Sequence, residues 1–324
     1  MSNPHLLHVA VGVLINSDNE VLVARRPDHL HQGGLLEFPG GKLEANEDRF
    51  SGLQREFAEE LDLTVESAFP LKQIVHHYDE ISVLLDVWTI TKYSGVAQGL
   101  EGQPIYWLPL AELSASDFPA ANAPIVDLLK LPRRLVITPE LLSFTELEVC
   151  LDTLLTQRVE IIYLRQNSAD EHRYTAWYWK ARDICRQSGC KLLFSSAQLA
   201  QRALGTDLTD TDGIHCSAQD LKKLDRRPVA SGQLFGASCH DLDELKRAEN
   251  LGADYATLSP VLSTAKYDDA QLLGWSEFSR LRMQVSLPVY ALGGLNPYTD
   301  QEIARVSGAQ GIAGISGFLS ESGD

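Results

Sequence analysis

Three glutamates in one short stretch have the clearest chemical potential in this sequence. Glu56, Glu59 and Glu60 lie in the segment 47–61, where apolar residues recur at helical spacing. A helix would put Glu56 and Glu60 one turn apart, and like charges at that spacing repel. Carboxylate oxygens are the ligands that hard divalent cations prefer. The pattern therefore indicates a Mg²⁺ site, with Mn²⁺ as the alternative ion, or else a solvated acidic helix face.

The residues before these glutamates are suited to position them. Gly40 and Gly41 allow a tight turn and a close backbone approach to a ligand. We expect Asn46 to be the N-cap of the helix, with Glu47 and Asp48 in its first turn, where negative charge suits the helix dipole. A glycine turn that leads into an acidic helix is a plausible binding element on physical grounds alone.

Composition favours an ordinary cytoplasmic protein. The net charge is −16, and residues 1–132 supply −11 of it, with 8 Lys and Arg against 19 Asp and Glu. Such acidity disfavours nucleic acid as a partner. No apolar run approaches the roughly 20 residues that span a bilayer, and the N-terminus lacks signal-peptide features, so no membrane association is expected. Five scattered cysteines indicate buried, reduced thiols.

The chain changes its pattern near residue 132, which predicts two domains, 1–132 and 135–324. In the first, 8–15 and 20–26 are expected to form a hairpin, and 81–90 another strand. In the second, short apolar strands alternate with helical patterns, which favours a (β/α)₈ TIM barrel over a doubly wound open sheet. The eight strands are expected at 135–138, 159–165, 191–196, 213–217, 234–240, 255–261, 288–294 and 311–316.

The acidic helix and its preceding turn resemble the Nudix box. Gly41 is followed after five residues by Glu47, and after seven more by REFAEE (55–60). LEFPGGK (36–42) and two further segments, EGQP (101–104) and DFPAAN (117–122), extend the similarity to MutT-type members over residues 5–132. This resemblance implies an α/β/α sandwich with a mixed sheet. Asp62 stands where the box has glycine, and we expect it to tolerate the positive φ needed there.

The resemblance also implies an activity. MutT-type enzymes use Mg²⁺ to split a nucleoside triphosphate, 8-oxo-dGTP in particular, into the monophosphate and diphosphate. This sanitation of the nucleotide pool serves DNA replication and repair without DNA binding. One arginine that such enzymes place near the base has no counterpart in HHYDEIS (76–82), so the preference for the oxidised base is less firmly implied than the hydrolysis.

Roles for individual residues of the first domain follow from the same resemblance. The metal ligands would be the Gly40 carbonyl and the carboxylates of Glu56, Glu59, Glu60 and Glu101. Either Glu56 or Glu101 would activate the attacking water. The structural residues of the box would be Gly41, Glu47 and Arg55, with the last two forming an ion pair. The substrate contacts would be Arg26 to a phosphate, His31 lining the pocket, Phe38 to the base or sugar, and Asn122 to the guanine edge.

The second domain resembles the thiamine phosphate synthase family and its relative TenI, a thiazole tautomerase. The similar segments run from YLR (163–165) to GAQGIAGIS (308–316) and span nearly all of 135–318. They imply a TIM barrel that binds a phosphorylated, thiazole-like small molecule. The implied phosphate-binding residues are Thr264, Lys266, Gly293, Gly294, Ile315 and Ser316, and the implied catalytic residue is His240.

The barrel departs from the synthase pattern where a diphosphate and its metal would be held. FSSA (194–197) replaces the usual Asn-Asp pair, Tyr163 replaces a glutamine, and a lysine is absent from RQNSAD (165–170). Three hypotheses follow for the chain: a MutT-like hydrolase with an accessory barrel, a thiamine-pathway enzyme whose barrel acts on thiazole phosphate, or a hydrolase whose barrel only binds a phosphate ligand or stabilises the chain.

Overall fold

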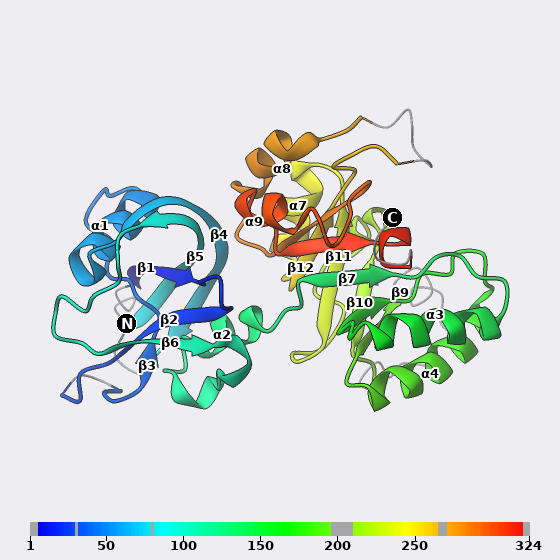
Figure 1. Cartoon of the computed structure of the whole chain (residues 1–324), viewed down its shortest axis with the longest axis horizontal. Helices are drawn as coiled ribbons and strands as arrows, with labels where there is room; N and C mark the ends of the chain where they lie inside the picture. Colours follow the sequence, from blue (N-terminus) through cyan, green and yellow to red (C-terminus); the bar gives the residue numbers. More distant parts are fainter. Residues whose placement is uncertain (1–5, 30–31, 79–80, 196–209, 265–270, 320–324) are drawn as a thin grey trace. The chain divides into compact units, whose positions relative to one another are not determined.

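The computed structural model describes residues 6–29, 32–78, 81–195, 210–264 and 271–319. The chain divides into two compact units, Met1–Leu131 and Pro132–Asp324, each with its own core (Figure 1). No helix in the described ranges has the length and apolar character needed to cross a membrane.

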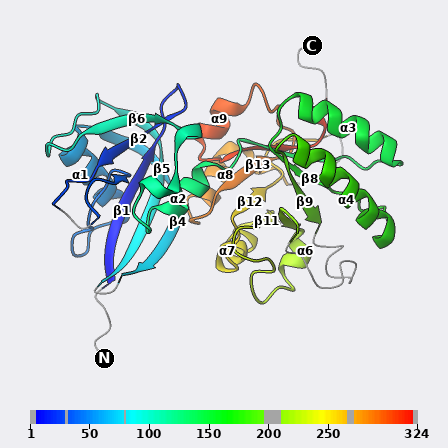
Figure 2. The same ribbon diagram turned by 90° about the horizontal axis from the view of Figure 1, so that it is seen from below.

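The first unit contains two three-stranded sheets. In the mixed sheet, β1 (Leu6–Leu14) runs parallel to β5 (Ser82–Ser94), and β5 is antiparallel to β4 (Thr64–His77). These three long strands lie side by side in Figure 2. The second sheet is antiparallel with the order β3-β2-β6, and its strands are Leu36–Glu37, Glu20–Arg25 and Ile105–Pro109.

The two α-helices among the described residues of this unit pack on separate clusters divided by the mixed sheet. Ala10 and Leu14 of β1 pack with α1 (Arg49–Leu61), whereas the alternate residues Val11 and Val13 pack with α2 (Ala123–Leu129). Two 3-10 turns, Leu110–Glu112 and Ala115–Asp117, precede α2. Because successive side chains of a strand point to opposite faces, this division confirms the predicted α/β/α sandwich with a mixed sheet.

The predicted hairpin of residues 8–15 and 20–26 is wrong. The strands β1 and β2 belong to different sheets and share only a single bridge, between Ile15 and Val21. The edge of β1 that faces away from β5 is instead occupied by the glycine turn that precedes α1, through the pairing of Val9 with Lys42. A strand has two edges, and both edges of β1 are already used.

The ends of α1 correct one prediction and confirm another. Its N-cap is Asp48, whose side chain accepts a hydrogen bond from the Phe50 N–H, so the prediction of Asn46 as the N-cap is wrong. Asn46 has φ 66° and belongs to the turn before the cap. The C-cap is Asp62 with φ 57° and ψ 34°, which confirms that aspartate adopts the left-handed geometry expected at this position.

The second unit is a closed eight-stranded parallel barrel, as predicted. The strands are β7 (Arg134–Ile137), β8 (Ile161–Tyr163), β9 (Lys191–Ser195), β10 (Gly213–Cys216), β11 (Leu234–Cys239), β12 (Tyr255–Leu258), β13 (Val289–Leu292) and β14 (Gly311–Gly314). The described helices are α3 (Phe144–Thr156), α4 (Glu171–Gln187), α6 (Ala218–Leu221), α7 (Leu242–Asn250), α8 (Gly274–Arg282) and α9 (Gln301–Val306), with a 3-10 turn at Ser316–Phe318. All eight strands fall within or beside the expected segments.

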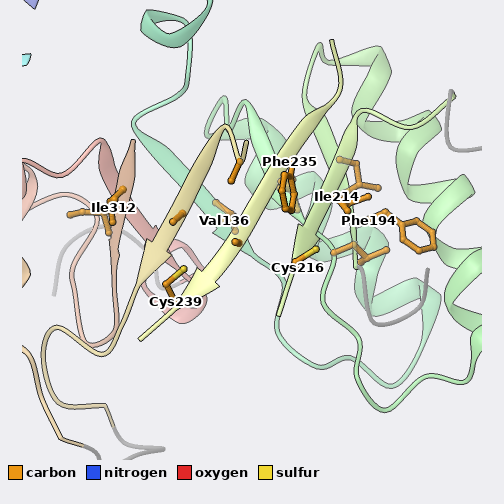
Figure 3. Close-up of a cluster of buried hydrophobic side chains, with 14 of the residues drawn as sticks. Val136, Phe194, Ile214, Cys216, Phe235, Cys239 and Ile312 are labelled. Carbon is orange, nitrogen blue, oxygen red and sulfur yellow. The ribbon is translucent and has the colours of Figure 1, made fainter. Parts of the chain in front are cut away.

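Alternate residues of the barrel strands form two cores. Val136, Ile214 and Phe235 belong to the larger core between strands and helices (Figure 3). Leu135 and Ile137, on either side of Val136, belong to the smaller core inside the barrel. All five cysteines are free and buried, and Cys216 and Cys239 are drawn in the larger core, which confirms the expectation of buried thiols.

Candidate active sites of the two domains

The turn that precedes α1 is built onto the edge of β1. The Ala10 N–H donates to the Gly41 carbonyl at 2.9 Å, and the Gly12 N–H donates to the Pro39 carbonyl at 2.9 Å. Strand-like hydrogen bonds of this kind leave the turn little freedom to shift along β1. The turn therefore has a defined position relative to the mixed sheet.

Two glycines let this turn approach the carboxylates of α1 closely. The Gly40 N–H donates to Glu60 Oε2 at 3.2 Å. Gly40 has φ 141°, and a Cβ added to it would lie 2.1 Å from the Ala10 carbonyl oxygen. A Cβ added to Gly41 would lie 2.2 Å from the Glu56 carboxyl group. Only glycine fits at position 40, because any side chain would collide with backbone, and a side chain at position 41 would push the Glu56 carboxyl group out of place.

Arg55 connects the turn, the helix and two of the glutamates. Its Nε and Nη2 each donate to Glu47 at 2.9 Å, and Nη2 also donates to the Lys42 carbonyl at 3.0 Å. Its Nη1 donates to Glu56 at 2.9 Å and to Glu59 at 3.0 Å. The hydrogen bonds from Arg55 lower the pKa of Glu47 to about 2, and Glu47 in turn raises the pKa of Arg55. This charge network orients the acidic face of α1.

The loop with Glu101 is tied to the same helix. Gln103 Nε2 donates to the Glu60 carbonyl at 3.1 Å, and the Leu100 N–H donates to the same oxygen at 2.9 Å. Gln103 Oε1 accepts from the Glu101 N–H at 2.9 Å. Sequence analysis missed Gln103, and the only signal for it was its place in the EGQP segment. It holds the Glu101 backbone beside the end of α1 that carries Glu60.

The gathered carboxylates disfavour one another's charge. Burial raises the pKa of Glu60 to about 7, and the charges of Glu56 and Glu101 add to this effect against the hydrogen bond from Gly40. Burial also raises the pKa of Glu56, although Arg55 opposes the shift. Negative charge is therefore costly in this partly desolvated place, and a bound cation would reduce that cost.

The residues of this site fit a hard divalent cation without forming a closed cage by themselves. In the part of the chain that the structure describes, no three Asp, Glu, His or Cys side chains lie together as a ready metal site. Arg55 draws Glu56 and Glu59 to itself, and Glu60 bonds to Gly40. The donors are all oxygens, and the raised pKa of Glu60 marks a place where positive charge is favoured.

The inside of the barrel contains a buried polar network. The Tyr163 ring stacks on His215 at 4.5 Å between centroids, and its hydroxyl lies 3.3 Å from Ser195 Oγ. His215 Nδ1 lies 2.9 Å from the Tyr255 hydroxyl, and Nε2 lies 2.8 Å from Ser238 Oγ. Burial lowers the pKa of His215 to about 3, so the imidazole is neutral. Sequence analysis missed His215 and Ser238 because neither one stands in a local pattern typical of catalysis.

The last two strands of the barrel end in open turns. Gly293 and Gly294 follow β13 with φ 103° and 67°, and a Cβ added to Gly294 would lie 2.2 Å from the Ser263 carbonyl oxygen. Ile315 and Ser316 follow β14, and Ser316 is exposed. Backbone N–H groups in such turns can bind phosphate at this end of a TIM barrel.

Two further predicted residues of the barrel follow β12 in the sequence. The Thr264 hydroxyl is buried and has no hydrogen-bond partner among the described residues. Lys266 lies outside the described residues. An unpartnered buried hydroxyl has hydrogen-bonding capacity that a ligand would satisfy.

His240 lies directly after β11 and is half exposed. Its Nδ1 lies 3.0 Å from Glu244 Oε2, which also accepts from the His240 N–H at 2.9 Å. Glu244 is buried and pairs with Lys222 at 3.0 Å. Glu244 was not predicted from the sequence, although its spacing from His240 is one helical turn. This carboxylate orients the imidazole and leaves Nε2 as the nitrogen that faces away from it.

Comparison with known proteins gives the same division of the chain. A model of the NUDIX domain matches residues 10–128, and a model of thiamine monophosphate synthase matches residues 135–318. An Escherichia coli (strain K12) protein named 8-oxo-dGTP diphosphatase is 36% identical over 124 residues, which are 38% of this chain and 96% of that protein. The first domain belongs to the Nudix family, and the second belongs to the thiamine monophosphate synthase family.

Relatives of both domains are known. A protein from Aquifex aeolicus (strain VF5) named putative thiamine-phosphate synthase 2 is 29% identical over 191 residues, 59% of this chain and all of that protein. A solved MutT structure, from work on Aliivibrio salmonicida and Vibrio cholerae, is 34% identical, covers 39% of this chain and 97% of its own, and has a TM-score of 0.34.

The residues of the Nudix domain that were predicted to contact the substrate differ in their surroundings. Arg26 Nη1 donates to Glu37, a partner that sequence analysis missed, and burial raises the pKa of Glu37 despite the arginine. Phe38 is only 3% exposed and stacks on Phe118 at 5.0 Å, so one ring face that we expected to meet a base is covered. His31 lies outside the described residues.

Asn122 of the Nudix domain keeps its side chain free. It occupies the N-cap position of α2, yet its side chain makes no capping hydrogen bond. Its amide has no hydrogen bond with any residue that the structure describes, and the residue is half-buried. An asparagine that is not used as a cap retains both its donor and its acceptor for a ligand.

Proposed function

We propose that the Nudix domain is a Mg²⁺-dependent nucleoside triphosphate pyrophosphohydrolase whose substrate is 8-oxo-dGTP and whose products are 8-oxo-dGMP and diphosphate. The observation that carries this proposal is that Glu60 and Glu56 lie against the Gly40–Gly41 turn, with the Glu101 loop hydrogen-bonded to the Glu60 carbonyl at the end of the same helix. The names of the Nudix relatives support the choice of substrate. Mn²⁺ is the alternative ion.

The residues of the turn and of α1 would hold the metal and the attacking water. The ligands would be the Gly40 carbonyl and the carboxylates of Glu56, Glu59, Glu60 and Glu101. A bound divalent ion neutralises phosphate charge and lowers the pKa of water. Arg55 keeps Glu56 turned toward the Gly41 side of the helix. Glu56 or Glu101 would accept the proton of the attacking water as general base.

Residues around the sheet would bind the nucleotide. Arg26 would exchange Glu37 for a phosphate of the substrate, and His31 would line the pocket. Phe38, stacked on Phe118, would offer its ring edge, and Asn122 would pair with the guanine edge. By removing an oxidised nucleotide before polymerisation, the enzyme would protect DNA in the cytoplasm without a nucleic-acid or membrane partner.

A hydrolysis screen tests this function. The full chain is incubated with 8-oxo-dGTP, dGTP and the other triphosphates, with thiamine diphosphate as the pathway alternative, in Mg²⁺ or in chelator. We expect the highest kcat/KM for 8-oxo-dGTP, with monophosphate and diphosphate as products. Release of orthophosphate, or equal rates in chelator, would contradict the proposal.

Replacing Asn122 by Ala should weaken the preference for guanine nucleotides more than it slows hydrolysis in general. A site that hydrogen-bonds a base edge loses selectivity when the partner is removed, by about tenfold or more. The measurement is the ratio of kcat/KM for 8-oxo-dGTP to that for dATP. Asn122→Asp is a second test variant, because it keeps the shape of the side chain but removes its hydrogen-bond donor. It should weaken the preference as well. An unchanged ratio in both variants would show that Asn122 does not read the base.

We infer a second function, the binding of a phosphorylated small molecule by the barrel. Its supports are the open turns at Gly293–Gly294 and Ile315–Ser316 and the unpartnered Thr264 hydroxyl, with Lys266 as the expected cation. His240, oriented by Glu244, would be the base if the barrel catalyses a proton transfer on a thiazole phosphate. Without catalysis, the barrel would be a binding module.

The barrel should not synthesise thiamine phosphate, although it should bind thiazole phosphate. Synthesis needs a diphosphate held through Mg²⁺, and at the corresponding strand end Ser195 offers only a hydroxyl, near that of Tyr163. Hydroxyls do not replace a carboxylate for a hard cation. The test supplies the full chain with aminopyrimidine diphosphate, thiazole phosphate and Mg²⁺. Formation of thiamine phosphate at an enzyme-like rate would refute the claim that the barrel does not synthesise it. Absence of thiazole phosphate binding in calorimetry would refute the claim that the barrel binds it.

A further inference from the structure

A buried carboxylate lies in the middle of the mixed sheet of the Nudix domain. Asp86 is on β5, the central strand, where it pairs in register with Ala10 of β1 and with Gln73 of β4. Its side chain is 0% exposed. It shares a sheet face with Trp88, two residues along, which packs in the cluster around α1. An ionised group in such a place is costly unless it is well paired.

The partner of Asp86 is the first residue of α1. Arg49 donates from both Nε and Nη2 to the two oxygens of Asp86, and its guanidinium also lies over the Trp88 ring, 5.3 Å from the centroid. A bidentate pair fixes orientation as well as distance. The start of α1 is therefore attached to the sheet at a single defined point.

Asp86 also lies against the strand that carries the glycine turn. His8 Nε2 on β1 is 3.4 Å from Asp86 Oδ2, although the nitrogen makes no hydrogen bond among the described residues. The His8 carbonyl accepts from the Leu43 N–H at 3.0 Å, at the end of the turn that includes Gly40 and Gly41. The Asp86 carboxylate thus contacts both halves of the site: α1, which carries Glu56 and Glu60, and β1, which holds the glycine turn.

The site leaves little room for movement between these halves. A methyl group at Gly41 would displace the Glu56 carboxyl group, and Gly40 bonds directly to Glu60. The apolar residues of α1 pack on the sheet, and burial of apolar surface has no preferred direction. Such packing resists separation of the helix from the sheet more than it resists sliding or rotation of the helix on the sheet. The bonds of Arg55 and Glu60 to the glycine turn are directional but lie further along the helix, and a directional contact at its start adds a second fixed point.

We propose that Asp86 is a positioning residue for the Nudix chemistry. Through Arg49 it fixes where α1 begins, and so where Glu56 and Glu60 stand against the glycine turn. This inference rests on the proposed hydrolase function. Removal of a group that hydrogen-bonds directly to a metal ligand typically changes metal affinity or activity by about 10- to 100-fold. Asp86 acts one contact further away, through Arg49, so we expect an effect at the lower end of that range.

The test compares variants of the full chain that remain folded at the assay temperature. In Asp86→Asn we expect kcat for 8-oxo-dGTP to fall about tenfold with little change in KM, and Mn²⁺ affinity, followed by electron paramagnetic resonance without nucleotide, to weaken by a similar factor. Arg49→Lys keeps the positive charge but cannot donate two parallel hydrogen bonds to Asp86. Its kcat and its Mn²⁺ affinity should therefore fall by less than those of Asp86→Asn. The double variant Arg49→Gln with Asp86→Asn, which can hydrogen-bond without charge, should recover part of both losses.

Ile90→Val is the matched control, because Ile90 lies four residues after Asp86 on the same strand and is buried in the cluster that contains Trp88. It should lower thermal stability and leave kcat and Mn²⁺ affinity unchanged. The proposal is overturned if Asp86→Asn keeps both quantities within about twofold, or if Ile90→Val changes them equally. If Asp86→Asn does not fold, Arg49→Lys decides by the same criteria. A wild-type chain without hydrolase activity would refute the proposed function, and Mn²⁺ affinity would still decide the role of Asp86.

Discussion

Glu60→Gln is expected to remove most Mg²⁺-dependent hydrolysis, on the order of 100-fold in kcat, while the domain stays folded. The side chain accepts from the Gly40 N–H and lies near the charges of Glu56 and Glu101. A neutral amide keeps the shape but loses charge and strength as a ligand for a hard cation. The measurement is turnover of 8-oxo-dGTP at saturating Mg²⁺.

The same variant should alter the pH dependence of stability in chelator. The pKa of Glu60 is raised from 4.5 to about 7, so between these values the folded wild type holds a proton that the unfolded chain has lost. The stability that Glu60 contributes to the metal-free wild type is therefore lost as pH rises through this window. The amide that replaces the carboxyl group cannot titrate, so thermal melts at pH 5 and pH 7 should differ less in the variant.

The control for both measurements is Glu112→Gln, an exposed glutamate of the same domain away from the turn and α1. It should behave as the wild type in turnover and in its melts. Turnover of Glu60→Gln close to the wild-type value at saturating Mg²⁺ would refute the role of Glu60 as a ligand. An unchanged pH slope would show that Glu60 does not carry the raised pKa.

Gly40→Ala is expected to destabilise the Nudix domain by about 3 kcal/mol and to abolish measurable hydrolysis. Alanine rarely adopts φ 141°, and its Cβ would lie 2.1 Å from the Ala10 carbonyl oxygen. Relief of that contact must move the turn off β1, and the move would break the hydrogen bond from Gly40 to Glu60. Urea unfolding and turnover of 8-oxo-dGTP measure the two effects.

Gly102→Ala separates the collision from the backbone strain in the stability measurement. Gly102 also has a positive φ, 79°, but a Cβ added there meets no atom within 4 Å. It should cost about 1 kcal/mol, the strain of a positive φ alone. If Gly40→Ala is no more destabilising than Gly102→Ala, then the turn is not packed against Ala10 as described.

Local pattern in the sequence was enough to predict much of the fold. The eight barrel strands follow from short apolar segments separated by helical patterns, because each segment buries its own side chains whatever its neighbours are. The acidic face of α1 follows from helical spacing in the same way. The glycines before it indicated a close approach, and Asp62 indicated a left-handed helix end.

Contacts between distant residues were decided only by the tertiary structure. A turn between two apolar segments suggested a hairpin, yet Gly41 and Pro39 took the edge of β1 that the hairpin needed. The sequence contained no sign that Gln103 would bond to the Glu60 carbonyl. These outcomes depend on which backbone groups compete for one strand edge or one hydrogen-bond acceptor. The competing groups are distant in the sequence, so no local periodic pattern predicts the result.

The difference between what local sequence predicts and what tertiary contacts decide is clearest for the charged residues. The type and spacing of Glu56, Glu59 and Glu60 indicated a site for a hard divalent cation, because ligand preference belongs to the side chain itself. Asp86, by contrast, is in the sequence only one acidic residue within a segment that is clearly predicted to be a strand. Its pairing with Arg49, 37 positions earlier, exists only because β5 passes beneath the start of α1 and burial leaves the carboxylate no water to bind.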